Sequence, residues 1–194
     1  MIERKPWLLL GWACLAIAAV PAFPAGGGFE SGIWSGEGRP VIVAKADLAV
    51  RSGPSLQSPV LQGKVIKKGD GIEFIETRVR TTEPGTLKAV RTETLKVTSY
   101  GESEYLSHDD YYAKGVSKPI KVKAGEPCEY LLYRAEGYHL IRIGREVMEV
   151  MDLDKHFEVV TPSTIEWWVG VGLGAGKKGW VLITDDIAGI TRSF

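Results

Sequence analysis

The chain has few cysteines and histidines and no surplus of either charge. Its 194 residues include two cysteines and three histidines, and 24 basic side chains are balanced by 24 acidic ones. Cys14 lies in an N-terminal apolar run, so removal of that run would leave Cys128 alone, without a partner for an internal disulfide. Binding nucleic acid through phosphates needs a surplus or a stripe of basic side chains, whereas acids and bases are interspersed here. The composition therefore excludes a disulfide framework and argues against nucleic acid as a partner.

The chain also lacks an apolar run long enough to span a bilayer. A start that contains Arg4 and Lys5 precedes an apolar run over residues 7–20, whereas a membrane helix needs about 20 apolar residues. Pro21 then ends the run, and cleavage is expected after Ala22 or Ala25. This pattern is typical of a cleaved secretory signal over residues 1–25. The sequence thus predicts an exported protein, periplasmic or secreted, with no stable membrane span after signal cleavage.

Groups that carry catalysis or bind metals are sparse. Cys128 has no helix N-terminus or cation beside it to lower the pKa of its thiol, so a small buried side chain is favoured over a nucleophile. The histidines have no paired spacing, and His108, Asp109 and Asp110 are adjacent, so they would not converge on one ion. We expect no enzymatic activity, no metal and no cofactor. A Cys/His hydrolase is the alternative, and it requires an exposed Cys128.

Glycine is abundant, and its densest run is WWVGVGLGAGKKGWVLI at residues 167–183. The run does not match the Walker phosphate-loop motif at two positions, because Val171 stands where the motif requires glycine and Lys178 stands where it requires serine or threonine. A dinucleotide fingerprint fits formally, but its chemistry needs a helix after the glycines, and a strand-like stretch follows instead. The run is predicted to be a hairpin tip.

From residue 41 onward the hydrophobic period is two rather than 3.6, with β-branched and aromatic residues between turn residues. The predicted fold class is therefore all-β. Two short helices are expected, one over residues 108–114 after the capping-box spacing of Ser107 and Asp110, and one over residues 152–157. Residues 26–40 are rich in glycine and serine and predict a flexible leader.

Residues 46–76, ADLAVRSGPSLQSPVLQGKVIKKGDGIEFIE, combine a strand ending in Val50 and Arg51, a Ser-Gly-Pro-Ser turn, a long loop, a strand and a Lys-Gly-Asp turn. This pattern resembles the opening of a bacterial SH3-type domain. Such a domain closes with an aromatic-led strand, a tight turn and a Gly-Trp-Val strand. That ending occurs only much later in the chain, at residues 168–171 and 179–181.

The resemblance implies a discontinuous SH3-like barrel, built from residues 41–77 and 164–184, with residues 79–160 inserted as a second β-rich domain. Within the insertion, residues 125–131 echo the turn and strand at residues 69–75. Turn and strand units of similar composition also recur by chance in all-β chains. A second SH3-like barrel nested in the first is one interpretation of the insertion.

The aromatic residues define the predicted binding site. In SH3-type barrels the aromatic positions held here by Trp168 and Trp180 either pack the core or line a groove beside the long loop. Adjacent strand residues point to opposite faces, so an exposed tryptophan could form a floor for an extended peptide or a glycan strand. The predicted groove lies between residues 51–63 and 167–181. Its predicted ligand-binding residues are Trp167, Trp168, Trp180, Tyr111, Tyr112 and Arg51.

The sequence thus predicts an exported, non-catalytic SH3-like protein that binds extended peptide or cell-wall glycan or peptide. The alternative is a structural or assembly protein of the cell envelope, which acts through contacts with an envelope protein. That alternative expects an exposed apolar patch or a free sheet edge within residues 87–150. A groove filled by the protein's own leader would also favour it.

Overall fold

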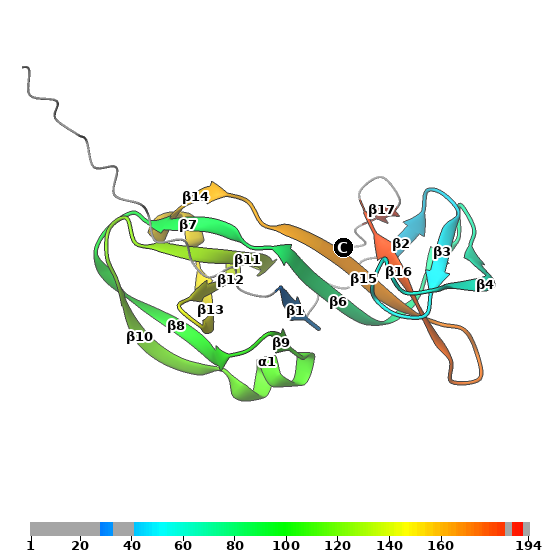
Figure 1. Cartoon of the computed structure of the whole chain (residues 1–194), viewed down its shortest axis with the longest axis horizontal. Helices are drawn as coiled ribbons and strands as arrows, with labels where there is room; N and C mark the ends of the chain where they lie inside the picture. The colour runs from blue at the N-terminus through cyan, green and yellow to red at the C-terminus, as the bar shows by residue number, and fades with distance from the viewer. Residues whose placement is uncertain (1–27, 33–40, 185–187, 192–194) are drawn as a thin grey trace, which may run out of the picture.

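The computed structural model describes residues 28–32, 41–184 and 188–191, and over these residues the fold is mostly β, as the hydrophobic period predicts (Figure 1). Among them are seventeen strands and two short helices. The predicted signal at residues 1–25 and most of the predicted leader lie outside the described residues. No described helix has both the length and the apolar character needed to cross a bilayer.

The first sheet brings together segments that are far apart in the sequence. In it β6 (Phe74–Glu83) pairs with β15 (Thr164–Gly172), and β16 (Lys178–Ile183) pairs with β3 (Leu48–Arg51), all antiparallel. A separate three-stranded sheet has the order β17 (Ala188–Thr191), β2 (Val41–Ala44) and β5 (Gly71–Ile72). The first sheet has seven strands in the order β4 (Val60–Ile66), β3 (Leu48–Arg51), β16 (Lys178–Ile183), β15 (Thr164–Gly172), β6 (Phe74–Glu83), β1 (Phe29–Ser31) and β9 (Tyr105–Leu106).

A second seven-stranded sheet takes its strands only from residues 85–161. Figure 1 shows it at the other end of the molecule from β2 to β4, with the long strands β6 and β15 running between the two ends. The predicted insertion at residues 79–160 therefore begins inside β6. The strand order is β10 (Val116–Val122), β8 (Glu93–Glu102), β13 (Glu146–Met151), β12 (Tyr138–Ile143), β11 (Pro127–Ala135), β7 (Gly85–Ala89) and β14 (Phe157–Thr161).

Both predicted helices are confirmed. Helix α1 (His108–Lys114) begins after Ser107, whose hydroxyl accepts a hydrogen bond from the backbone N–H of Asp110 at 3.0 Å, as its capping-box spacing predicts. Helix α2 (Leu153–His156) is a single turn that buries Leu153. The glycine run forms the β15–β16 hairpin, with a tip at residues 173–177.

Within the described part of the chain, the buried apolar residues form three cores. The first core draws on both ends of the sequence and contains Ile42, Ala44, Leu48, Val50, Ile72, Val169, Val171, Val181 and Ile183. The second core, which includes Leu87, Val97, Ile141 and Phe157, lies within the second sheet. Between them is a junction core of Phe29, Val79, Leu106, Leu131, Leu132, Leu140 and Val147, which joins strands of both sheets.

The predicted flexible leader requires a correction, because Phe29–Ser31 forms strand β1. It pairs antiparallel with β6 and parallel with β9, and Phe29 is fully buried in the junction core. The Glu30 carboxylate accepts hydrogen bonds from Arg78 at 2.6 Å and from Arg80 at 3.0 Å. Burial raises the pKa of Glu30, but the hydrogen bonds and charges of the two arginines outweigh it and leave that pKa lowered. These long-range partners, rather than local sequence, order the segment.

Candidate functional site

The three tryptophans of the predicted site do not form an exposed floor. Trp168 is fully buried, and Trp180 is 4% exposed. Trp167 points to the opposite face of β15, where its indole N–H donates to the Thr77 hydroxyl at 2.9 Å. Its ring packs against both the first core and the junction core. Their side chains therefore serve packing, as large aromatic residues usually do.

The ring of Trp180 is already in contact with cations of the same chain. The Lys178 ammonium lies 4.8 Å from the ring centroid, and the Arg78 guanidinium lies 5.8 Å from it. Arg78 also lies 5.0 Å from the ring centroid of Tyr105 on β9. Cations over aromatic faces stabilise such an arrangement by about 0.5–1 kcal/mol at exposed sites. A sugar or peptide would have to displace these side chains in order to stack on Trp180.

Arg51 shapes the loop at residues 52–59 rather than facing a ligand. Its Nη1 donates to the carbonyl oxygens of Leu56 at 2.9 Å and of Ser58 at 2.8 Å. These two bonds replace backbone pairing that an irregular loop cannot make. The side chain thereby fixes the chain between β3 and β4, and it lies outside the lining of the groove described below.

Tyr111 and Tyr112 lie on α1, which is attached to the second sheet through a buried polar cluster. Tyr111 donates a hydrogen bond to Glu149, and the Arg134 guanidinium lies 4.3 Å from the Tyr111 ring centroid. Burial raises the pKa of Glu149 more than the Tyr111 hydrogen bond and the Arg134 charge lower it. Tyr112 is 65% exposed and accepts a hydrogen bond from Arg134 at 3.2 Å. The cluster fixes α1 to the sheet, so the six predicted residues fall into separate environments.

The thiol and the histidines do not form a nucleophile and base pair. Cys128 is buried in the second core, and burial, helped by the charges of Glu126 and Glu129, raises its pKa to about 12. His139 contacts the Tyr130 hydroxyl at 3.1 Å, and burial lowers the pKa of this histidine. His156 pairs with Glu93 at 3.2 Å. Among the described residues, no group of three or more His, Cys, Asp or Glu side chains could hold a metal ion.

The environment of Cys128 predicts slow alkylation. In protein that lacks residues 1–25, Cys128 is the only thiol, and iodoacetamide at pH 8 should label the native state at least about a hundredfold more slowly than the urea-unfolded state, because a thiol with so high a pKa is almost entirely protonated. Mass spectrometry of timed samples measures both rates. Equal rates would revive the Cys/His hydrolase alternative.

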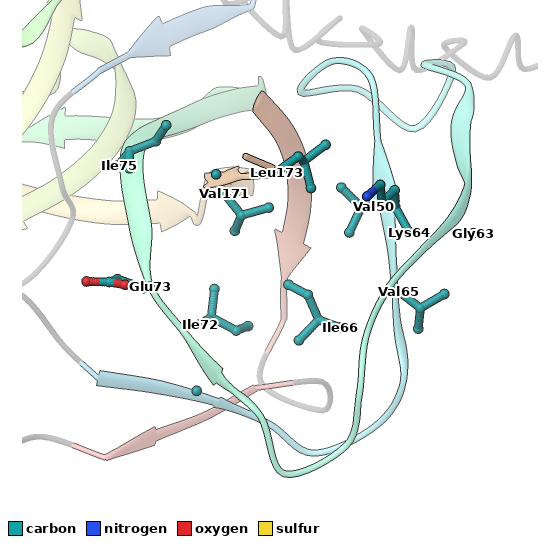
Figure 2. A pocket seen from close by; sticks show the side chains of 12 residues that line it. Val50, Gly63, Lys64, Val65, Ile66, Ile72, Glu73, Ile75, Val171 and Leu173 are labelled. Carbon is teal, nitrogen blue, oxygen red and sulfur yellow. The ribbon is translucent and has the colours of Figure 1, made fainter. Parts of the chain in front are cut away.

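An open groove lies instead between β4 and the chain that joins β5 to β6. Its volume is about 750 Å³, which is within the usual range for ligand sites. Figure 2 shows Ile66 and Ile72 pointing toward one another from opposite walls, whereas Val65 and Glu73 point away. Val171 lies at the floor. The lining residues are Val50, Gly63, Lys64, Val65, Ile66, Gly71, Ile72, Glu73, Ile75, Val171, Gly172 and Leu173.

Glycine exposes backbone on both sides of this groove. A Cβ added at Gly63, Gly71 or Gly172 would meet no other atom within 4 Å, so open space adjoins the chain at each position. Only Gly63 of the three has a positive φ, at 70°. Without a side chain, the backbone at these positions can be approached closely by a bound molecule. The groove therefore combines aliphatic side chains, such as Ile66 and Ile72, with closely approachable backbone.

The groove predicted between residues 51–63 and 167–181 shares Gly63 and residues 171–173 with this lining, but none of the six predicted ligand-binding residues lines it. The apolar residues of the lining alternate with polar ones as in any buried strand, and this alternation does not distinguish a closed, packed core from a groove that is open to solvent. The usable signal was the pair of glycines, Gly71 and Gly172, placed where two apolar strands begin or end.

A scan against protein-family models, a search of curated proteins and a search of solved structures find no match for this chain.

Proposed function

We propose that this chain is an exported, non-catalytic SH3-like binding protein, whose discontinuous unit of residues 41–77 and 164–184 recognises an extended polypeptide, such as a cell-wall or envelope peptide. The open groove between β4 and β5–β6, which Ile66 and Ile72 line from opposite walls, supports the proposal most directly. The first core, which combines residues of both segments, supports a single folded unit. The burial of Cys128 gives no support to a hydrolase.

The shape of the groove favours an extended ligand over a compact one. It lies between β4 and β5, each of which is the last strand of its sheet (Figure 2). Apolar floors with accessible backbone suit peptides, because side chains fill the floor while peptide groups pair with the walls. Ile75, which lines the groove, is 63% exposed and so leaves an apolar side chain open to a ligand.

Filling the groove should weaken binding without harming the fold. Gly172 lies in the lining, has no positive φ and has open space at its Cβ, so Gly172→Phe adds a side chain there without backbone strain. We expect affinity for peptides selected from a displayed library to fall at least about tenfold, since the ring occupies the ligand's place. Titration calorimetry measures the affinity.

Two variants control this experiment. Gly71→Phe, on the opposite wall, should act in the same way, whereas Lys96→Phe adds an exposed ring on β8, away from the groove, and should leave affinity unchanged. The melting temperature of all three should stay close to that of the wild type. Wild-type affinity in both groove variants would place the binding site elsewhere.

One observation favours the assembly role as a second candidate. Strand β14 lies just beyond the range 87–150 in which this role predicts a free edge; it ends the second sheet, pairs only with β7 among the described strands, and exposes Val159 by 50% and Val160 by 46%. Strand β10, at the other end, carries Lys118, Pro119 and Lys121, which protect an edge against pairing. If an envelope protein docks along β14, Val159→Lys should abolish its binding, whereas Gly172→Phe should leave that binding unchanged. The two variants therefore separate the two functions.

A further inference from the structure

The outer edge of β4 has backbone N–H and C=O groups that the sheet does not pair. Strand β4 is the last strand of the first sheet and pairs with β3 alone among the described strands. Val60 opposes Arg51, and Val65 opposes Ala49, so the four residues from Leu61 to Lys64 oppose only Val50. Few of their N–H and C=O groups can therefore join the β3 ladder. The backbone is still extended over this stretch.

Two of these four residues, Gly63 and Lys64, lie at the groove wall. Val65 and Ile66, which pair with β3, continue the lining, and the apolar side chains of Ile72 and Val171 line the same groove. Peptide groups that are not paired within a protein need water or a ligand as partners. A wall with spare peptide groups above an apolar floor has the requirements of strand addition, in which main-chain bonds give affinity and alternate side chains enter pockets.

We propose that the partner segment binds in the groove as an added β-strand along residues 61–66 of β4, with alternate apolar side chains on the floor and an acidic side chain beside Lys64. This inference rests on the proposed function. It selects an extended strand over the left-handed polyproline conformation as the form of the ligand, because polyproline helices have no regular backbone pairing with a strand edge.

Lys64 favours a partner segment that carries an acidic side chain. It lines the groove, and no ion pair within the described residues engages it, whereas its neighbour Lys67 is paired with Asp47 at 2.8 Å. Opposite charges on adjacent strands stabilise pairing, and like charges oppose it. A segment of alternating apolar residues with one acidic residue between them therefore matches both the floor and this wall.

The test begins with a displayed library of random dodecapeptides selected on the mature protein. Selected peptides should alternate apolar residues, lack proline and carry an acidic residue. Each is then synthesised with N-methyl groups on one of the two alternating sets of backbone amides. Methylation of the set that faces β4 should weaken binding at least about tenfold, because each lost bond leaves a peptide group unpaired, and methylation of the other set should change it less than about threefold.

A charge exchange fixes the register. Lys64→Glu should weaken the acidic peptide about two- to fivefold, and replacement of the peptide's acidic residue by lysine should restore affinity to that variant. Lys68→Glu is the matched control, since Lys68 lies on the turn after β4 and outside the lining, and it should have little effect. Lys64 is exposed, so its replacement should leave the melting temperature unchanged.

Three outcomes would overturn the proposal, and they differ in what they leave standing. Proline-rich peptides that tolerate both methylation patterns would reject strand addition and keep a peptide-binding function. Failure of any peptide to enrich would reject both. A concentration-dependent dimer in sedimentation that Gly172→Phe abolishes would assign the groove to a second copy of this chain.

Discussion

Replacement of Trp168 with alanine is expected to destabilise the protein by about 3–5 kcal/mol, the range for removing a buried large aromatic side chain. Trp168 is fully buried on β15, and its indole N–H donates to Glu166 at 3.0 Å. Loss of the ring leaves a cavity and removes that bond. Urea denaturation followed by circular dichroism measures the difference. This expectation replaces the prediction from sequence that Trp168 contacts a ligand.

Tyr112→Ala provides the matched control for Trp168→Ala. Tyr112 is also an aromatic residue of the predicted site, but it is 65% exposed, so its loss should cost about 1 kcal/mol or less. Trp168→Phe should fall between the two, because it keeps most of the buried ring and loses the N–H donor. A Trp168→Ala protein as stable as the Tyr112 variant would contradict the assigned burial.

The predicted site and the groove differ because strand alternation assigns side chains to faces but does not say what covers each face. Trp167 and Trp168 do point to opposite sides of β15, as their adjacent positions require. From the sequence alone, one of the two tryptophans is expected to lie on an exposed face of the strand. In the structure Trp168 is fully buried and Trp167 is held by Thr77 and two cores, so both sides of the strand are covered at this point.

Local signals predicted the local structures well. The capping box predicted α1, and the glycine run predicted the β15–β16 hairpin, because both structures depend on neighbouring residues. Strand β1 depends on partners that lie about fifty or more residues away in the sequence, such as Arg78 and Leu106. Three residues surrounded by glycine and serine carry no period of their own, so only the folded chain identifies them as a strand.

Phe29→Ala is expected to cost about 3–5 kcal/mol as well, with consequences at the junction of the two sheets. Phe29 is fully buried against Val79 of β6 and Leu106 of β9, and its strand is the only one described between β6 and β9. Hydrogen exchange with mass spectrometry should show lost protection in β1 and β9. The strands around the first core should keep most of theirs, since none of that core's buried residues belongs to the junction core.

Phe157→Ala separates this junction effect from a general loss of stability. Phe157 is 3% exposed, so its removal should cost a similar free energy, but it belongs to the second core and to β14. Exchange should then increase in β7 and β14 and change little in β1 and β9. Identical exchange patterns in the two variants would mean that the molecule unfolds as one cooperative unit. Distinct patterns would mean that β1 holds two separately stable halves together, and that the groove can keep its shape when the junction loosens.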